Sequence, residues 1–90
     1  MAGFTLYARS YCHLCDEMLT ALQVVLRALS PQQSCTVAVI DIDAAAAQGD
    51  SGPLERYDEL VPVLFGDPLG PPLCHYFLDE EAVRHWLATQ

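Results

Sequence analysis

A change in the spacing of apolar residues constrains the fold of this chain more than any other feature. From Leu14 to Leu29, apolar side chains recur every three or four residues, which is the period of one helix face. Apolar segments without that period lie on either side, at Phe4 to Ala8 and at Cys35 to Asp43. The order of strand, helix and strand predicts a parallel pair joined by a right-handed crossover. Because the second segment is β-branched and almost continuously apolar, we expect it to be a buried parallel strand.

Turn-forming residues divide the rest of the chain into shorter elements. Pro53 is acceptable in the first turn of a helix, and Asp79 is a favoured N-cap. A link rich in glycine and proline between two apolar segments predicts an antiparallel hairpin. The expected elements are a small-residue loop at 44–52 whose alanines could extend into a helical turn, a helix at 53–60, strands at 63–65 and 73–77 joined by the link at 66–72, and a final helix at 79–88. The predicted fold class is α/β, in the order β-α-β-α-β-β-α, with helices on both faces of a mixed sheet.

Length and charge exclude several classes of protein. The chain has 90 residues, enough for one domain over 1–90, and no apolar run approaches the ~18 residues of a membrane helix. Twelve acidic residues oppose four arginines and no lysine, for a net charge of −8. This balance argues against nucleic acid or an anionic membrane as partner, because both require a basic surface. An acidic rim is also expected to disfavour acidic substrates.

The four cysteines, at positions 12, 15, 35 and 74, are too few and too unevenly spaced for a secreted disulfide scaffold. No basic or long apolar segment precedes the first strand, so we expect a cytoplasmic location, where thiols are kept reduced. In that compartment the pair Cys12-His13-Leu14-Cys15 is a candidate for catalysis or metal binding. Cys35 and Cys74 are expected to be small apolar residues in strands, with a regulatory thiol as the alternative.

Cys12 and Cys15 fall at the junction between the first strand and the first helix. Side chains three residues apart on a helix are neighbours, so a small adjustment brings the two sulfurs within disulfide range. Unpaired N–H groups at the helix N-terminus favour the thiolate form of Cys12, whereas Cys15 lies further in and is expected to be buried. We expect Cys12 to attack a substrate disulfide and Cys15 to release the product by attacking the mixed disulfide.

Charged neighbours act on the expected thiolate in both directions. Arg9 and a protonated His13 would stabilise it, whereas Asp16 and Glu17 would oppose it. The sequence does not fix the sign of their net effect on the reactivity of the first cysteine.

Two other uses of the CxxC pair stay open at this point. A structural zinc site usually has four ligands in two close pairs, and the second pair here would have to be Cys74-His75. Adjacent residues of a strand point to opposite faces, so this second pair is poorly placed to hold one ion. The other possibility is an inert CxxC in a well-packed domain.

Five short segments, in order along the chain, are more informative together than any one of them alone. They are Tyr-Cys-His-Leu-Cys-Asp-Glu at 11–17, Val-Ile-Asp-Ile-Asp at 39–43, Leu-Glu-Arg-Tyr at 54–57, Val-Pro-Val-Leu at 61–64, and Leu-Asp-Glu-Glu-Ala-Val-Arg-His-Trp-Leu at 78–87. Together they resemble the small glutaredoxin-like family of the thioredoxin superfamily, over nearly the whole chain. The resemblance implies a four-stranded sheet with the first strand inside it and three flanking helices. It also implies that Cys12 is the nucleophile, Cys15 the resolving thiol, and Pro62 a cis-proline beside them.

The resemblance further implies a substrate site around the cysteine pair. In similar proteins the cis-proline turns the backbone of the preceding residue, here Val61, toward the cysteine-containing segment of the substrate. Arg9 stands where glutaredoxins place a basic residue, and Tyr11 and His13 flank the first cysteine. We therefore expect Arg9, Tyr11, His13, Val61 and Pro62 to bind substrate. The alternative for Pro62 is a proline that merely begins an edge strand.

Other positions depart from the pattern with which glutaredoxins hold glutathione. Leu60 stands where a threonine would precede Val-Pro, Phe77-Leu78 replaces a Gly-Gly pair, and Leu14 replaces an aromatic residue inside the motif. Because two or three of the polar contacts are missing, the sequence gives only weak support for glutathione and does not predict its tight binding.

The sequence thus predicts a thiol–disulfide oxidoreductase that uses Cys12 and Cys15 without a bound cofactor or metal. Its substrate would be a protein or a low-molecular-weight thiol or disulfide, and its reductant glutathione or another dithiol protein. Two alternatives remain. One is a binding module that docks a partner near Pro62 without turnover, and the other is a carrier of a metal or cluster.

Overall fold

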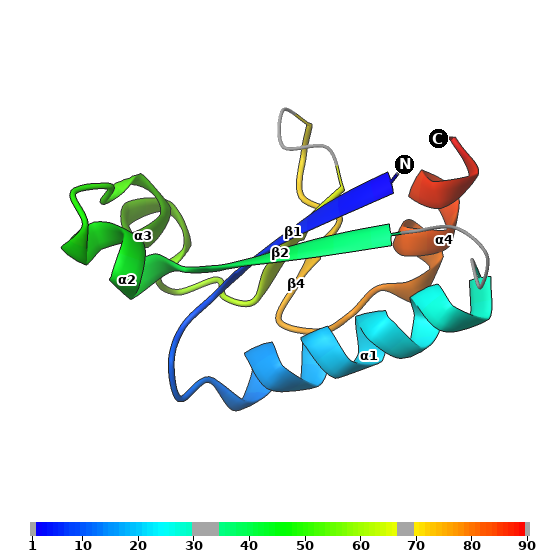
Figure 1. Ribbon diagram of the computed structural model, residues 1–90, viewed down its shortest axis with the longest axis horizontal. Coiled ribbons are helices and arrows are strands. Elements are labelled where there is room, and N and C mark those ends of the chain that lie inside the picture. Colours follow the sequence, from blue (N-terminus) through cyan, green and yellow to red (C-terminus); the bar gives the residue numbers. More distant parts are fainter. Residues whose placement is uncertain (1, 30–34, 67–69, 90) are drawn as a thin grey trace.

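The strands of the protein form one mixed sheet in the order β2-β1-β3-β4 (Figure 1). The computed structural model describes residues 2–29, 35–66 and 70–89. Its strands are β1 (Ala2–Ala8), β2 (Cys35–Asp41), β3 (Val63–Phe65) and β4 (Cys74–His75). β1 is parallel to β2 and antiparallel to β3, and β4 is antiparallel to β3. The expected mixed sheet with the first strand in its interior is confirmed.

The described residues form four helices, not the expected three. They are α1 (His13–Leu29), α2 (Ile42–Ala47), α3 (Gly52–Tyr57) and α4 (Glu80–Ala88). The additional helix, α2, begins where we expected the second strand to continue, because the Asp41 side chain accepts hydrogen bonds from the amides of Asp43 and Ala44. Such an N-cap supplies partners for the first amides of a helix, which lack them within the helix. The second strand therefore ends at Asp41, and the alanines that follow are helical, which is the alternative that the sequence left open for this loop.

α3 ends three residues earlier than the sequence suggested. The amides of Leu60 and Val61 both donate to the carbonyl of Tyr57, at 2.9 and 3.1 Å, and so close a turn after the helix. This turn leads the chain directly into Pro62 and β3. In the described part of the chain, no helix is long and apolar enough to cross a membrane.

One face of the sheet is covered by α1 and α4. Leu6 of β1 and Leu64 of β3 are almost fully buried there, against Leu22 of α1 and Val83 of α4. The buried cluster consists of Phe4, Leu6, Met18, Leu22, Val25, Leu26, Leu64 and Val83. The apolar period in the sequence of the first helix is therefore confirmed as its contact face with the sheet.

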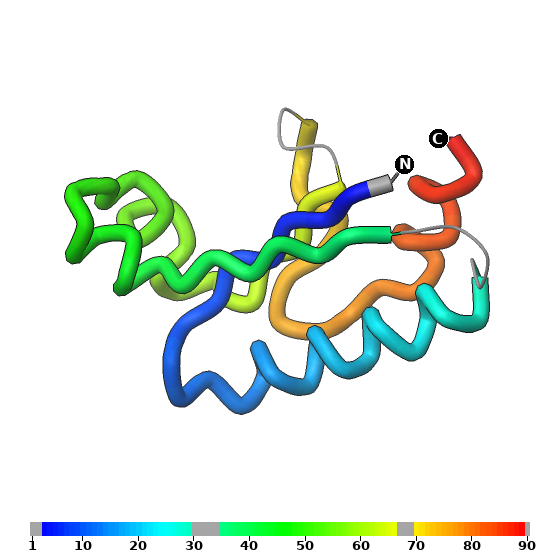
Figure 2. Tube along the Cα trace, in the orientation of Figure 1, coloured from blue at the N-terminus to red at the C-terminus, as the bar shows by residue number. Residues whose placement is uncertain are grey.

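The opposite face of the sheet carries a cluster of aromatic rings. Tyr57 of α3 packs against Tyr7 of β1 and Phe65 of β3, with ring centroids 4.8 and 5.9 Å away. Burial raises the pKa of Tyr7 above its ordinary value. α2 and α3 lie at the end of the sheet away from α4 (Figure 2), while Thr36 and Ala38 of β2 are exposed. Helices thus cover both faces, as expected, but the second face only at one end.

β2 is parallel to β1 as expected, but it is not buried. It lies at an edge of the sheet, and its residues are half-buried or exposed along its length. Val39 has 51% of its surface exposed. A continuous apolar run is typical of a strand with neighbouring strands on both sides. β2 has a neighbouring strand, β1, on one side only.

β4 covers only two residues, where the sequence suggested a strand at 73–77. Tyr76, directly after it, has φ of 64°, in the left-handed region that an extended strand does not use. This backbone turn ends the strand and redirects the chain toward α4. Residues 67–69 of the expected link lie outside the described residues.

Candidate active site

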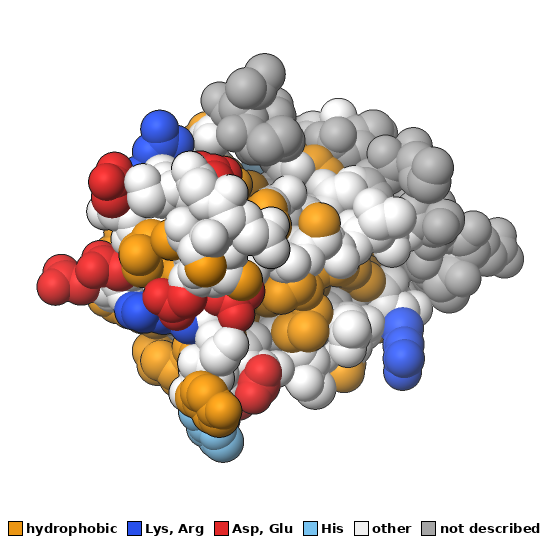
Figure 3. Space-filling model, turned by 60° about the vertical axis from the view of Figure 1, so that its left-hand side comes forward, with side chains coloured by type: hydrophobic (Ala, Val, Ile, Leu, Met, Phe, Trp, Pro, Cys, Tyr) orange, Lys and Arg blue, Asp and Glu red, His pale blue; other side chains and the backbone are white. Residues whose placement is uncertain are grey.

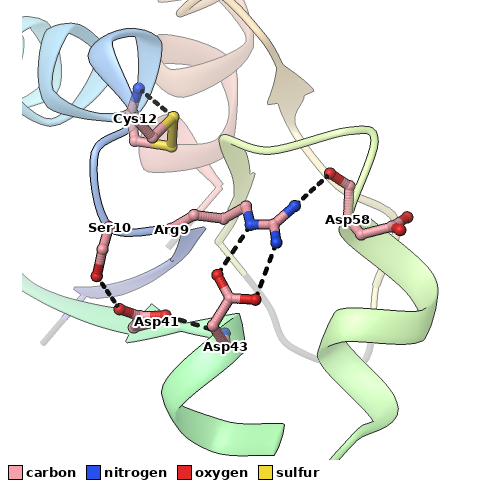
Figure 4. Close-up of a disulfide and its surroundings, with 7 residues drawn as sticks. Arg9, Ser10, Cys12, Asp41, Asp43 and Asp58 are labelled. Atoms are coloured by element: carbon pink, nitrogen blue, oxygen red, sulfur yellow. Dashed lines mark hydrogen bonds and ion pairs between the residues drawn. A yellow bond between two sulfur atoms is a disulfide. The ribbon is translucent and has the colours of Figure 1, made fainter.

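A disulfide joins Cys12 and Cys15 between the end of β1 and the first turn of α1 (Figure 4). The Cα atoms of the two residues are 5.2 Å apart. Cys12 directly precedes α1 and is half-buried, whereas Cys15, inside the helix, is only 3% exposed. The first sulfur is therefore the more accessible of the two, as the sequence predicted.

The sulfur of Cys12 occupies the N-cap position of α1. The amide of Cys15 donates a hydrogen bond to Cys12 Sγ at 3.1 Å, and the amide of Asp16 donates to the Cys12 carbonyl at 3.2 Å. A reduced sulfur in this position would accept from the same amide, at the end of the helix that carries partial positive charge. Both effects favour a thiolate over a thiol at Cys12.

Arg9 is held by carboxylate and carbonyl oxygens. Its Nε and Nη2 donate to the two carboxylate oxygens of Asp43, each at 2.9 Å, and Nη1 donates to the carbonyl of Asp58 at 3.3 Å. This hydrogen bonding raises the pKa of Arg9 above its ordinary value. Figure 4 shows the guanidinium directed toward Asp43 and Asp58. The positive charge expected beside the reactive thiol is thus paired with a carboxylate.

His13 is engaged by an acidic neighbour as well. Its Nε2 lies 3.4 Å from a carboxylate oxygen of Glu17, one helical turn along α1. The His13 side chain is 89% exposed, so it projects from the site into solvent. A protonated imidazole here would share its charge with Glu17.

A second hydrogen bond ties the loop before Cys12 to the end of β2. Ser10 Oγ donates to Asp41 Oδ2 at 2.8 Å, while the other carboxylate oxygen of Asp41 caps α2. The Ser10 hydroxyl, together with the Ala44 and Asp43 amides, lowers the pKa of Asp41 below its ordinary value. Arg9 and Ser10 therefore fix the loop through two acids on one segment.

Val61 and Pro62 lie at the same end of the sheet as the disulfide. β3 is antiparallel to β1, with Val63 opposite Tyr7, so the residues before β3 lie beside those that follow β1. The Val61–Pro62 peptide bond is cis, and Pro62 is fully buried. The Val61 amide is already engaged by the Tyr57 carbonyl at 3.1 Å.

Large apolar side chains are exposed at this end of the sheet. Tyr11, next to Cys12, is fully exposed and has φ of 59°; Leu60 and Tyr76 are 39% and 38% exposed, and Phe77 is 69% exposed. Tyr76 is anchored, because its amide donates to the Pro62 carbonyl at 2.9 Å and its hydroxyl to the Glu59 carbonyl. We refer to Tyr11, Leu60, Tyr76 and Phe77 as the apolar rim.

The other two cysteines lie apart from the disulfide. Cys35 of β2 and Cys74 of β4 are half-buried free thiols that pack against the main core. Burial raises the pKa of Cys74 above its ordinary value. Within residues 2–29, 35–66 and 70–89, no three His, Cys, Asp or Glu side chains are grouped to hold a metal ion.

Sequence reasoning missed the acids that hold Arg9 and Ser10. Asp41 and Asp43 close the most apolar strand of the sequence, and the carboxyl ends of parallel strands meet at one edge of a sheet. Their position after β2 was therefore a usable signal. Tyr76 and Phe77 were assigned to a strand, and no signal in the sequence marked the turn that exposes them.

The strand order, α1 and the disulfide at its N-terminus define a glutaredoxin-like protein of the thioredoxin fold class. Comparison with protein families agrees, because the model of the family described as Glutaredoxin-like domain (DUF836) matches residues 4–88. The chain belongs to this family.

Two solved structures are similar over almost their full length. The solution NMR structure of protein Ne2328 from Nitrosomonas europaea is 32% identical, with a TM-score of 0.69, over 94% of this chain and 89% of that one. The X-ray structure of protein XcR50 from X. campestris is 31% identical, with a TM-score of 0.61, over 97% of each chain. A search of curated proteins found no match.

Proposed function

We propose that the protein is a thiol–disulfide oxidoreductase that works through a reversible Cys12–Cys15 dithiol/disulfide pair. The observation that carries the proposal is the position of Cys12 Sγ at the N-terminus of α1, 3.1 Å from the Cys15 amide. An accessible sulfur in this position is activated as a thiolate, and a buried partner three residues on can resolve its adducts. Membership of the glutaredoxin-like family supports a redox role.

The reaction proceeds by two exchanges. The Cys12 thiolate attacks one sulfur of a substrate disulfide; a bond forms between the two sulfurs, and the other substrate sulfur leaves as a thiolate and takes up a proton. Cys15 then loses its proton and attacks Cys12 Sγ. The Cys12–Cys15 bond forms, the second substrate sulfur leaves and is protonated, and two electrons have passed to the substrate. A dithiol protein, or two molecules of glutathione, returns the pair to its reduced form.

The residues at this end of the sheet would place the substrate. Val61 and Tyr11 are proposed to contact the segment that carries the substrate cysteine. Pro62, which is fully buried, is proposed to position Val61, while Arg9 and His13 set the charge around Cys12. No bound cofactor takes part in these steps. A cytoplasmic location fits the cycle, because the compartment supplies reduced thiols.

Trapping with cysteine variants tests the assignment of roles. Cys15→Ser should accumulate a mixed disulfide with a peptide disulfide, because the first exchange occurs and the second cannot. Cys12→Ser should not accumulate one, and Cys74→Ser should behave like the unmodified protein. Mass spectrometry under non-reducing conditions measures each adduct. Equal trapping by the Cys12 and Cys15 variants would contradict the proposal.

A binding module without turnover is the second candidate, and the exposed apolar rim favours it. In that case a variant with both Cys12→Ser and Cys15→Ser would bind its partner as tightly as the unmodified protein. The oxidoreductase instead requires both cysteines to complete the two-electron transfer, so a reductase assay of the same variant should show no turnover.

A further inference from the structure

We infer that the Cys12–Cys15 site acts on cationic, cysteine-containing segments of proteins in preference to glutathione and other anionic disulfides. The inference rests on the proposed oxidoreductase function and names the substrate class of the same site. It follows from the pairing of the cations beside Cys12, from the acids that surround them and from the apolar rim.

The two cations that the sequence places beside Cys12 both face carboxylates. The Arg9 guanidinium makes a bidentate pair with Asp43, and its remaining nitrogen donates to the Asp58 carbonyl. His13 Nε2 lies 3.4 Å from Glu17. To bind Arg9, a carboxylate of glutathione would have to displace Asp43 from the guanidinium. This displacement is unfavourable, because bidentate guanidinium–carboxylate pairs are among the strong charged contacts. The cationic groups that could bind an anionic substrate are therefore already paired with carboxylates of the protein itself.

The other charges at this end of the sheet are mostly negative. Besides the paired Asp43 and Glu17, carboxylates lie at the start of α1, the end of β2 and the turn after α3, at Asp16, Asp41, Asp58 and Glu59. Arg56, in the last turn of α3, is a further cation there. Figure 3 shows acidic and apolar side chains interleaved, with basic ones among them, on the side of the molecule that carries α2 and α3. A field of one sign attracts substrates of the opposite sign and repels those of its own sign. Lysine and arginine beside the substrate cysteine are the complementary groups.

The apolar rim gives a protein segment contacts that a small tripeptide cannot fill. Tyr11 and Phe77 are 107% and 69% exposed, and Leu60 lies next to Val61, whose neighbour Pro62 is tied to Tyr76. Exposed aromatic side chains of this kind are enriched where proteins contact one another. The occupant is therefore an extended segment with an apolar residue near its cysteine and basic residues around it.

Three disulfide probes test the inference on the full chain in its reduced form. Two peptides of equal length, one with lysines and one with glutamates around a Leu-Cys pair, are each joined to 2-mercaptoethanol; the third probe is oxidised glutathione. Each rate of protein oxidation is divided by the rate at which free 2-mercaptoethanol reacts with the same probe, to remove intrinsic reactivity. At low salt the cationic peptide should react about tenfold faster than the anionic one. In roughly 1 M salt, where the Debye length is about 3 Å, the two rates should converge.

Matched variants locate the effect. Glu59→Gln should lower the cationic preference about twofold, whereas Glu81→Gln, which removes the same charge from α4, should leave it unchanged. Phe77→Ala should slow the peptides about fivefold but not the disulfide of 2-mercaptoethanol with itself, since a small probe does not reach the rim. Val24→Ala is its control, because Val24 is also exposed but lies roughly 18 Å along α1 from Cys12 at 1.5 Å per residue.

The outcomes separate the two proposals. If the reduced protein transfers electrons to none of the probes, the oxidoreductase function and the substrate class both fail. Suppose instead that all three probes oxidise the protein, but that the two peptides react equally fast at low salt or that oxidised glutathione reacts fastest. In either case the oxidoreductase function stands and the proposed substrate class is wrong.

Discussion

Arg9 and Asp43 form a bidentate ion pair, with both nitrogen–oxygen distances at 2.9 Å, that joins the loop before Cys12 to the first turn of α2. The two residues are 34 positions apart in the sequence and meet because β1 and β2 run parallel and end at the same edge of the sheet. The pair orders the loop and at the same time neutralises the cation that stands three residues before Cys12.

Removing the Asp43 charge should make the Cys12 thiol more reactive. In Asp43→Asn the guanidinium of Arg9 is no longer balanced, so its field favours the thiolate at Cys12. We expect the reduced variant to react with iodoacetamide at pH 6 about threefold faster at Cys12, because a larger fraction of the thiol is then ionised. Glu55→Gln, an exposed acid of α3, is the control. Equal rates in Asp43→Asn and the unmodified protein would show that Asp43 does not moderate Arg9.

In the same alkylation reaction, the thiol of Cys74 should react more slowly than that of Cys12. Burial raises its pKa, so its thiolate is scarce near neutral pH. At pH 8 we expect Cys74 to be alkylated at least about tenfold more slowly than Cys12, and to lose that protection when urea unfolds the chain. Peptide mapping after timed alkylation measures both sites. Fast labelling of Cys74 in the native protein would contradict its burial against the core.

Asp41 should make the stability of the fold depend on pH in the acid range. Its pKa in the folded protein lies below the ordinary value of 3.8, because of the Ser10 hydroxyl and the α2 amides. The carboxylate therefore contributes stability that is fully present above about pH 5 and is lost as the pH falls through its folded pKa. Urea unfolding should show Asp41→Asn to be less stable than the unmodified protein at pH 7, with the difference shrinking near pH 2.5. A difference independent of pH would exclude this origin, and Ser10→Ala should reduce the pH dependence.

Gly66 should not tolerate a side chain. A Cβ at this position would overlap the indole ring of Trp86, which also packs against Phe4 with ring centroids 4.8 Å apart. We expect Gly66→Ala to lower the free energy of unfolding by about 1–3 kcal/mol, the usual cost of overpacking. Gly52→Ala is the matched control: its Cβ would meet only Asp50 at 3.5 Å, and alanine in a helix should be neutral or stabilising by up to about 1 kcal/mol. Urea denaturation compares the two, and equal stabilities would refute the packing argument.

Local patterns in the sequence were sufficient for the order of the elements other than α2, and for the cysteine pair. The helical period from Leu14 to Leu29 reflects burial on one side, and it predicted α1 and its contact face. Cys12 and Cys15 could be placed at the helix start because a strand ended just before them. Both predictions use residues that lie close in the sequence to the element they predict, so no distant contact was needed to make them.

Other features depend on contacts that no local pattern encodes. α2 replaced the end of a strand because the Asp41 carboxylate caps it, although the residues around it are apolar and β-branched. The exposure of β2 follows from its place at the sheet edge, which its own residues do not reveal. The partners of Arg9 come from two separate segments, so the sequence could name the cation but not the acids that neutralise it.

A redox titration of the Cys12–Cys15 pair tests the central claim most directly. The protein is equilibrated in buffers of defined dithiol and disulfide ratio, the free thiols are trapped, and the oxidised fraction is read by mass. We expect a reversible two-electron transition between about −120 and −270 mV, the range of working oxidoreductases. A potential below about −300 mV, typical of disulfides that serve only to stabilise a fold, would contradict it.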